Sequence, residues 1–192
     1  IADFSKTNKA VAIADVPDAP TIGVATNVGT SRAYNDGSAT VTVTAGATGG
    51  SPTSYVVTSD PGSFTGTSAS PVTVTGLQSG TSYTFTAVPT NSTGSGPASS
   101  SSNSITATST AQAPTIGAVT NNGSGRAYNN GSATIAFTAS AANGGSAITG
   151  YTVTSTPGSY TATGASSPLT VTGQQSGTAY TYAVTATNGN GV

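Results

Sequence analysis

An internal repeat constrains the fold of this chain more than any other feature. Residues 19–45, APTIGVATNVGTSRAYNDGSATVTVTA, return as residues 113–139, APTIGAVTNNGSGRAYNNGSATIAFTA, at an offset of 94. Residues 54–64 match residues 150–160 at an offset of 96, and residues 70–91 match residues 167–188 at 97. A period of this length is the size of a small domain. The 192 residues therefore predict two tandem domains rather than one.

Three added residues account for the drift in the offset. Two of them fall around Asn143 and Gly144, and the third lies near Gly164. Both places lie between predicted strands, where loops tolerate insertions. We therefore expect the two copies to share one strand plan and to differ in loop length.

Within each copy the apolar residues alternate with a period of two. Alanine and valine alternate with threonine along residues 39–45, and residues 133–139 carry the same pattern. Turn dipeptides such as Asp36-Gly37 and Pro157-Gly158 separate short runs of this kind at intervals of roughly ten residues. The pattern predicts an all-β chain of two tandem antiparallel β-sandwiches, with the apolar residues facing a core and threonine facing water.

Residues 76–100, GLQSGTSYTFTAVPTNSTGSGPASS, carry a family resemblance. They resemble the late strands of fibronectin type III modules, which follow the pattern Gly-Leu-x-x-Gly-Thr-x-Tyr-x-Phe-x-Val-x-Ala-x-Asn-x-x-Gly. The resemblance covers nearly the whole chain, twice, and implies fibronectin type III or immunoglobulin-like sandwiches. It also implies that Tyr83 and Tyr180 are tyrosine-corner residues, whose hydroxyls bond to the backbone near Gly80 and Gly177.

The same resemblance implies further structural roles. Leu77 would fill the core beneath the turn, and Tyr55 and Tyr151 would lie on the third strand of each module. The sequence departs from the family pattern in three ways. The Trp that the family has on its second strand is absent, with Ala45 and Ala139 near that place. Gln174 stands where the first copy has Leu77, and Pro89 stands where the family usually has alanine. Because proline has no backbone N–H, we expect a bulge or an early strand end at Pro89.

The segments RAYNDGSATVTVT and RAYNNGSATIAFT are similar to segments of tandem modules in structural proteins of tailed bacteriophages of marine cyanobacteria. Related arrays of low charge occur in bacterial surface proteins. This resemblance implies an extracellular setting, on a virion or on a bacterial cell surface.

Composition excludes most chemistry within this chain. It contains no His, Cys, Met, Trp or Glu, and only 5% of its residues are charged. Disulfides, zinc sites of Cys or His and Ser-His-Asp catalysis are therefore impossible. With no catalytic or cofactor-binding constellation in the remaining residues, we expect a protein that is not an enzyme and binds no cofactor.

The small number of charges also bears on partners. Four Lys and Arg residues at a net charge of -1 cannot neutralise several phosphates, so we expect no binding of nucleic acid. We expect no membrane span, because no apolar run approaches the roughly 18 residues that a spanning helix needs. The aspartates Asp15, Asp18, Asp36 and Asp60 could bind Ca²⁺ in pairs at a junction, but solvated turn residues are the better interpretation, and we expect no metal site.

Alignment of the two copies divides the chain into three parts. Residues 1–18 align with the end of the first copy, with Val11 on Ile105, and are interpreted as the last strand of a preceding module plus a linker. Residues 19–112 form the first module with its linker, and residues 113–192 form the second module without a last strand. Either the chain is a window of a longer array, or residues 8–15 complete the last module of a neighbouring copy by donor-strand exchange.

Arg32 and Tyr34 recur as Arg126 and Tyr128, in a chain with almost no other cationic residues. These four residues could contact a partner. The simpler interpretation is that each Arg lies on the Tyr of its own module and caps carbonyl groups of its own loop.

Three functions remain open. The first is a non-catalytic structural spacer or display module, with neighbouring modules or copies of itself as partners. The second is an adhesion module that binds a host-surface glycan or protein through its polar loops. The third is a fibre subunit that assembles by donor-strand exchange, which a net charge near zero favours.

Overall fold

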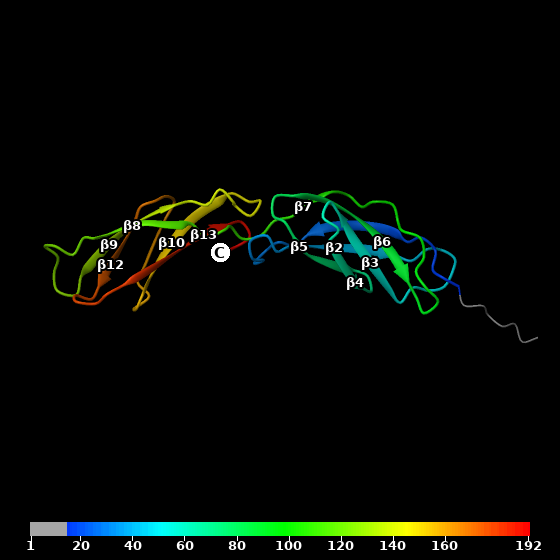
Figure 1. Cartoon of the computed structure of the whole chain (residues 1–192), viewed down its shortest axis with the longest axis horizontal. Coiled ribbons are helices and arrows are strands. Elements are labelled where there is room, and N and C mark those ends of the chain that lie inside the picture. Colours follow the sequence, from blue (N-terminus) through cyan, green and yellow to red (C-terminus); the bar gives the residue numbers. More distant parts are fainter. Residues whose placement is uncertain (1–14) are drawn as a thin grey trace, which may run out of the picture.

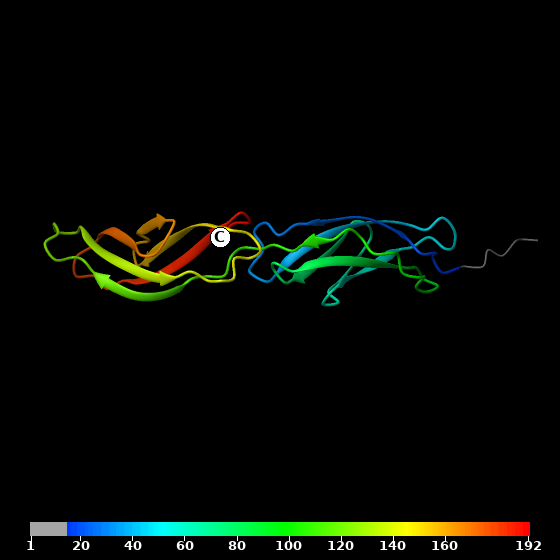
Figure 2. The same cartoon turned by 90° about the horizontal axis from the view of Figure 1, so that it is seen from above.

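A computed structural model describes residues 15–192, so residues 8–14 of the expected leading strand lie outside the described residues. The described chain is all-β, in two sandwiches that follow one another along a single axis (Figures 1 and 2). None of its elements is a helix of the length and apolarity needed to span a membrane. The predicted fold class is confirmed: the chain is all-β and forms two tandem antiparallel β-sandwiches.

Each module consists of two facing antiparallel sheets. In the first module one sheet has the order β1-β2-β5 and the other the order β4-β3-β6-β7. The strands are β1 (Thr21–Asn27), β2 (Gly37–Thr44), β3 (Ser54–Asp60), β4 (Thr65–Ser68), β5 (Val72–Leu77), β6 (Ser82–Thr90) and β7 (Ile105–Thr106).

The second module repeats six of these strands in the same arrangement. Its sheets have the orders β12-β9-β8 and β11-β10-β13. The strands are β8 (Thr115–Asn121), β9 (Gly131–Thr138), β10 (Ile148–Thr156), β11 (Thr161–Gly164), β12 (Leu169–Gln174) and β13 (Thr181–Asn188). Within the described residues, β13 pairs with β10 only, whereas its counterpart β6 has partners on both edges.

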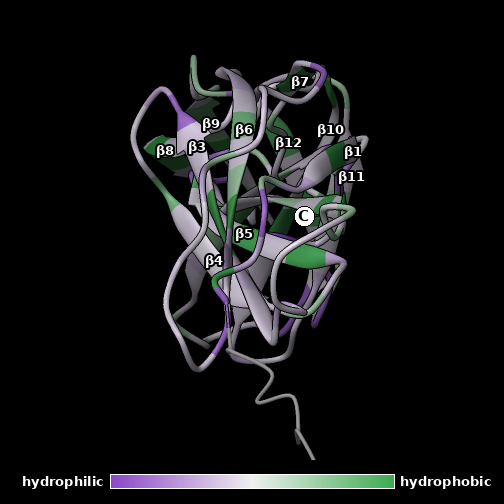
Figure 3. Ribbon diagram, turned by 90° about the vertical axis from the view of Figure 1, so that its right-hand side faces the viewer, coloured by the Kyte–Doolittle hydropathy of each residue, from purple (hydrophilic) through white to green (hydrophobic). Residues whose placement is uncertain are grey.

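Alternation along the strands forms the two cores. On β2 the side chains of Ala39, Val41 and Val43 are buried, while Thr42 and Thr44 face solvent. The largest fully buried side chains of the first module include Tyr83, Phe85 and Leu77. Most of the ribbon has intermediate hydropathy, and strongly hydrophilic residues are confined to short stretches (Figure 3). On β2 the exposed positions are held by the hydroxyl side chains of Thr42 and Thr44.

Both tyrosines of the family pattern accept a hydrogen bond from the preceding turn. The Tyr83 hydroxyl accepts the N–H of Gln78 at 3.0 Å, and the Tyr180 hydroxyl accepts the N–H of Gln175 at 2.9 Å. Their rings also pack alike, since Tyr83 meets Phe64 edge-on and Tyr180 meets Tyr160 edge-on, each at 6.0 Å between ring centroids.

The other structural residues also lie in the cores. Leu77 is fully buried, and Tyr55 and Tyr151 are buried on β3 and β10. Gln174, the counterpart of Leu77, is buried beside Tyr182, the counterpart of Phe85, and its amide lies 2.8 Å from the Tyr182 hydroxyl. Two apolar side chains of the first module are thus replaced by a hydrogen-bonded polar pair in the second, so neither polar group is buried alone.

The bulge or strand end expected at Pro89 is wrong. The pairing of β3 with β6 continues without a register shift from Asp60↔Thr84 to Ser54↔Thr90. Ala87 and Phe85, which lie two and four residues before Pro89, direct their N–H groups away from β3, toward Ser99 and Ser102. By this alternation the backbone nitrogen of Pro89 also points away from β3. The missing N–H therefore removes no hydrogen bond between β3 and β6.

A segment of serines closes the outer edge of β6. The N–H of Ser99 donates to the Ala87 carbonyl at 2.8 Å, and its hydroxyl accepts the Ala87 N–H at 2.9 Å. Ser102 forms the same two contacts with Phe85, at 2.9 and 3.0 Å. One serine thus satisfies both polar backbone groups of the residue it faces. This arrangement protects the edge from pairing with another chain.

The matched tyrosines allow a test of burial. Tyr83 is 2% exposed, whereas Tyr180 is half-buried, so water can replace the lost hydrogen bond only at Tyr180. We expect Tyr83→Phe to lower the free energy of unfolding of the first module by about 1–2 kcal/mol, and Tyr180→Phe to cost the second module less than about 1 kcal/mol. Urea unfolding, followed by NMR signals of each module, measures both. Equal losses would contradict the assigned difference in burial.

Candidate functional site at the module junction

The candidate functional site is the junction between the modules, where residues 107–112 pass from one to the other. Among the backbone hydrogen bonds that hold this linker to the first module, Ala107 N–H donates to the Thr81 carbonyl at 2.9 Å, and Thr110 N–H donates to the Arg32 carbonyl at 2.8 Å. Two more hold it to the second module, from Ser109 N–H to the Gly144 carbonyl and from Gln112 N–H to the Ala142 carbonyl. Because bonds to the two modules interleave along six residues, the linker has little freedom to bend.

Asn188, at the end of β13, clamps the linker from the side of the second module. Its amide nitrogen donates to the carbonyls of Ser109 and Asn143, each at 2.8 Å, and its amide oxygen accepts the N–H of Asn190 at 2.9 Å. The side chain is buried, so water cannot replace these bonds. One amide therefore connects the linker with two loops of the second module.

Asn190 extends this clamp to the first module. Its carbonyl accepts the N–H of Ser31 at 2.6 Å, and its side-chain oxygen lies 3.1 Å from the Thr108 hydroxyl. Its amide nitrogen donates to the Ser109 carbonyl at 3.1 Å. The loop after β13 thus contacts both the linker and the loop between β1 and β2.

Glycines allow the two modules to approach closely beside the linker. A Cβ on Gly145 would lie 3.0 Å from the Ala107 carbonyl oxygen and 3.2 Å from the Gly80 Cα. Gly145 and Gly80 also have positive φ angles of 75° and 80°, which glycine adopts without strain. The side chain that any other residue would carry at position 145 would push the modules apart.

The added residues of the second copy lie in this contact. Asn143, Gly144 and Gly145 belong to the loop between β9 and β10, where the sequence predicts a two-residue insertion. That loop supplies the carbonyls that bind Asn188 and Ser109, and the glycine that packs on Gly80. The insertion therefore builds the junction, which the sequence alone did not indicate.

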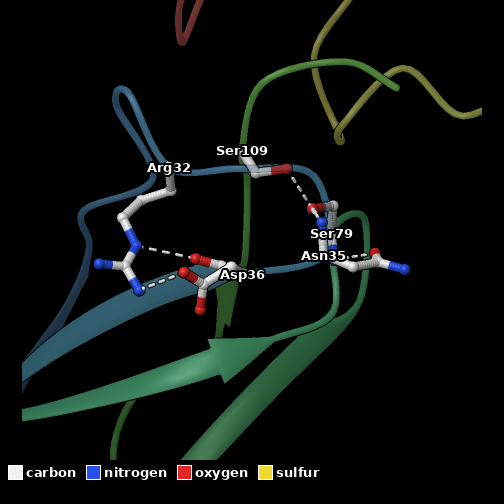
Figure 4. A network of polar contacts seen from close by, with 5 residues as sticks. All are labelled: Arg32, Asn35, Asp36, Ser79 and Ser109. Carbon is white, nitrogen blue, oxygen red and sulfur yellow. Dashed lines mark hydrogen bonds and ion pairs between the residues drawn. The ribbon is translucent and has the colours of Figure 1, made fainter. Parts of the chain in front are cut away.

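Arg32 lies in the loop of the first module that faces the junction. Its Nε donates to the Asp36 carbonyl and its Nη2 to the Asp36 carboxylate, each at 2.8 Å (Figure 4). In the same network Asn35 and Ser79 exchange two hydrogen bonds, and the Ser79 hydroxyl contacts that of Ser109 on the linker. Arg32 therefore braces the loop that receives the linker.

Arg126 repeats this arrangement at the far end of the second module. Its Nε donates to the Asn130 carbonyl, and its Nη2 lies 3.3 Å from the Asn130 side-chain oxygen. Each arginine thus caps a carbonyl of its own loop, but stacking on Tyr34 or Tyr128 is not among the aromatic contacts of the described residues. Tyr34 is half-buried, and Tyr128 is 85% exposed.

Sequence reasoning missed the asparagine clamp, although a signal was present. Asn91 and Gly94 in the first copy align with Asn188 and Gly191 in the second, and each Asn donates its N–H to the carbonyl of its Gly at 3.0 Å. Asn91 also donates to the carbonyl of Asp15, which aligns with Ser109. Each module thus holds the residues before its own first strand in the same way.

No protein-family model and no curated protein matches this chain. Among the solved structures similar to it is that of the FN1–FN3 domains of chicken CNTN1, with 17% sequence identity and a TM-score of 0.45. The similarity covers 93% of this chain and 65% of that one, so this chain spans less than two thirds of the length of the chicken structure.

The clamp can be tested with a matched pair of variants. Asn188→Ala leaves the carbonyls of Ser109 and Asn143 without this donor, so we expect the second module to lose about 1–3 kcal/mol of stability and the modules to reorient freely. Residual dipolar couplings of the two modules measure their relative order. Asn91→Ala removes the equivalent clamp at Asp15 and should leave the inter-module order unchanged. Loss of order in both variants, or in neither, would contradict the assignment.

Proposed function

We propose that this chain is a non-catalytic spacer, in which sandwich modules set one part of a larger extracellular assembly at a fixed distance from another. The observation that carries this proposal is the junction. A linker of a few residues is bonded alternately to both modules, and the clamp of Asn188 and Asn190 secures it from the side. Such a junction transmits orientation from one module to the next, which a flexible linker cannot do.

The composition agrees with this role. Only 5% of the residues are charged, so the chain offers few groups for ionic contacts with other molecules. On a fold of this type, binding or catalysis depends on specific residues rather than on the fold itself. At the junction the polar groups bond to one another and hold the modules together, which is what a spacer requires.

The setting that we propose is an appendage of a virion, such as a tail or fibre, or a bacterial surface protein. Support for this setting comes from the similarity of the segments RAYNDGSATVTVT and RAYNNGSATIAFT to tandem modules of phage structural proteins. In this setting the partners are neighbouring modules of the same kind. Recognition and anchoring would then belong to other parts of the assembly.

An adhesion module is the second candidate, and one observation favours it. Tyr128 is 85% exposed on the loop that also carries Arg126. An exposed aromatic ring beside a cation can stack on a sugar or on an apolar side chain. Under this alternative, Tyr128→Ala abolishes binding of the chain to a glycan array, whereas Tyr34→Ala at the half-buried counterpart has less effect. Absence of any binding by the unchanged chain would remove this candidate.

The spacer proposal makes a prediction about rotational motion. If the junction is stiff, ¹⁵N relaxation of both modules fits one common diffusion tensor of an elongated body. Insertion of Gly-Ser-Gly-Ser between Thr108 and Ser109, inside the bonded linker, should separate the tensors and leave the unfolding midpoint of each module nearly unchanged. Two independent tensors in the unaltered chain would overturn the spacer proposal.

A further inference from the structure

The second module contains a groove beside the edge of β13 that pairs with no other strand of residues 15–192. It has a volume of about 540 Å³, and we define the strand groove by six of its lining residues. These are Val119, Asn121, Gly123, Gly131, Gly177 and Tyr182. The groove is not part of the junction, because Arg126 and Ala127, at the far end of the module, also line it.

Each residue that defines the strand groove has a counterpart in the first module that contacts residues 102–108. Ala25, the counterpart of Val119, exchanges two backbone hydrogen bonds with the side chain of Asn103, at 2.8 and 3.0 Å. Asn27, the counterpart of Asn121, forms two hydrogen bonds with Thr108, at 2.7 and 3.2 Å. On the β1 side, therefore, the segment is held by side-chain amides of asparagine.

The opposite wall of the first module holds the same segment through its backbone. Gly80, the counterpart of Gly177, donates its N–H to the Ala107 carbonyl at 2.8 Å. Tyr83 pairs with Ile105, and Phe85, the counterpart of Tyr182, exchanges two hydrogen bonds with Ser102. The segment therefore connects the two sheets of the sandwich along one side.

A comparison of side-chain exposure in the two modules shows that residues 102–108 cover one side of the core of the first module. Ala25 is 3% exposed, whereas Val119 at the same position of the second module is 48% exposed. Tyr83 is buried and Tyr180 only half-buried, and every residue of β8 is exposed. The second module thus presents an apolar strip next to backbone N–H and C=O groups, which is the surface that strand addition uses.

We propose that the strand groove binds an extended peptide strand with the sequence pattern of residues 99–108, SSSSNSITAT. Two serines three residues apart would bond the backbone of Tyr182 and Val184, as Ser99 and Ser102 bond that of Ala87 and Phe85. The Asn would bridge the edge of β8, and the Ile-x-Ala end would cover Val119 and Tyr180. This inference rests on the repeat and its contacts and is independent of the spacer proposal.

The polar pair of the second module suits this ligand. Gln174 and Tyr182, which bond to each other, both line the groove where the first module has Leu77 and Phe85. They add hydrogen-bonding groups to the floor of a groove whose ligand is rich in serine and threonine. A strand bound here would leave the module beside Arg126, just as the linker leaves the first module beside Arg32.

The test uses the full chain and a synthetic peptide with the sequence of residues 96–110, GPASSSSNSITATST. We expect saturable binding by isothermal titration calorimetry, together with slower amide hydrogen exchange at Tyr182 and Val184. A peptide of the same composition in scrambled order is the control. No binding up to about 1 mM peptide, or equal binding of the scrambled peptide, would overturn the proposal.

A glycine supplies a matched variant that blocks the groove without touching the fold. A Cβ on Gly29 would collide with the backbone carbonyl of Thr108, whereas a Cβ on its counterpart Gly123 would meet only the side chain of Asn121. We therefore expect Gly123→Ala to leave the unfolding midpoint of the free chain unchanged and to weaken peptide binding at least about tenfold. Unchanged affinity in a folded Gly123→Ala chain would place the peptide elsewhere and overturn the proposal.

A second peptide distinguishes another occupant. Residues 7–16, TNKAVAIADV, align with residues 101–110 and carry valine and isoleucine where that segment has Ile105 and Ala107. If this peptide binds the groove more tightly than residues 96–110 do, and the chain forms concentration-dependent oligomers, the occupant is the leading segment of a second copy. That result would overturn the proposed ligand in favour of donor-strand exchange.

Discussion

The backbone N–H and C=O groups on the outer edge of β6 need hydrogen-bond partners. Residues 99–107 supply them, and this segment determines much of the remaining structure. Ser99 and Ser102 bond this edge, Asn103 ties it to β1, and Ala107 closes the turn before β6. The same segment continues without a break into the linker at the junction. The segment that completes the core of the first module is therefore also the start of the linker. Its position at the edge of β6 consequently helps to set the orientation of the second module relative to the first.

The two modules show what this segment contributes, because they share a strand plan and differ at this edge. Their inner strands are buried alike, with Val57 and Val153 both fully buried. The differences lie along β1 and β8, where Ala25 is covered and Val119 is not, and along β6 and β13, where Phe85 is buried and its counterpart Tyr182 is half-buried. Burial of a single edge segment thus affects the side of the sandwich that joins the two sheets, and β3 and β10 depend on it much less.

Much of the fold follows from local sequence. Period-two alternation places the buried residues of β2 and β9, and the repeat predicts that both copies use the same turns. Arg32 and Arg126 were expected to cap carbonyls of their own loops, and they lie on Asp36 and Asn130. Pro89 could not be judged from sequence, because its effect depends on whether the absent N–H would face β3 or the opposite side. That direction can be assigned only when the pairing register of β3 and β6 is known.

By itself, the sequence determined the number of modules, their all-β class and the residues that form each core, because these follow from a period and from the alternation of apolar side chains. Only the tertiary structure decided the roles of Asn188 and Asn190, of the inserted Asn143 and Gly144, and of the serines at 99 and 102. Each of these residues acts on a backbone group that is far away in sequence. Such pairings depend on how strands and loops meet in space, and asparagine, glycine and serine in a loop are equally compatible with a solvated turn.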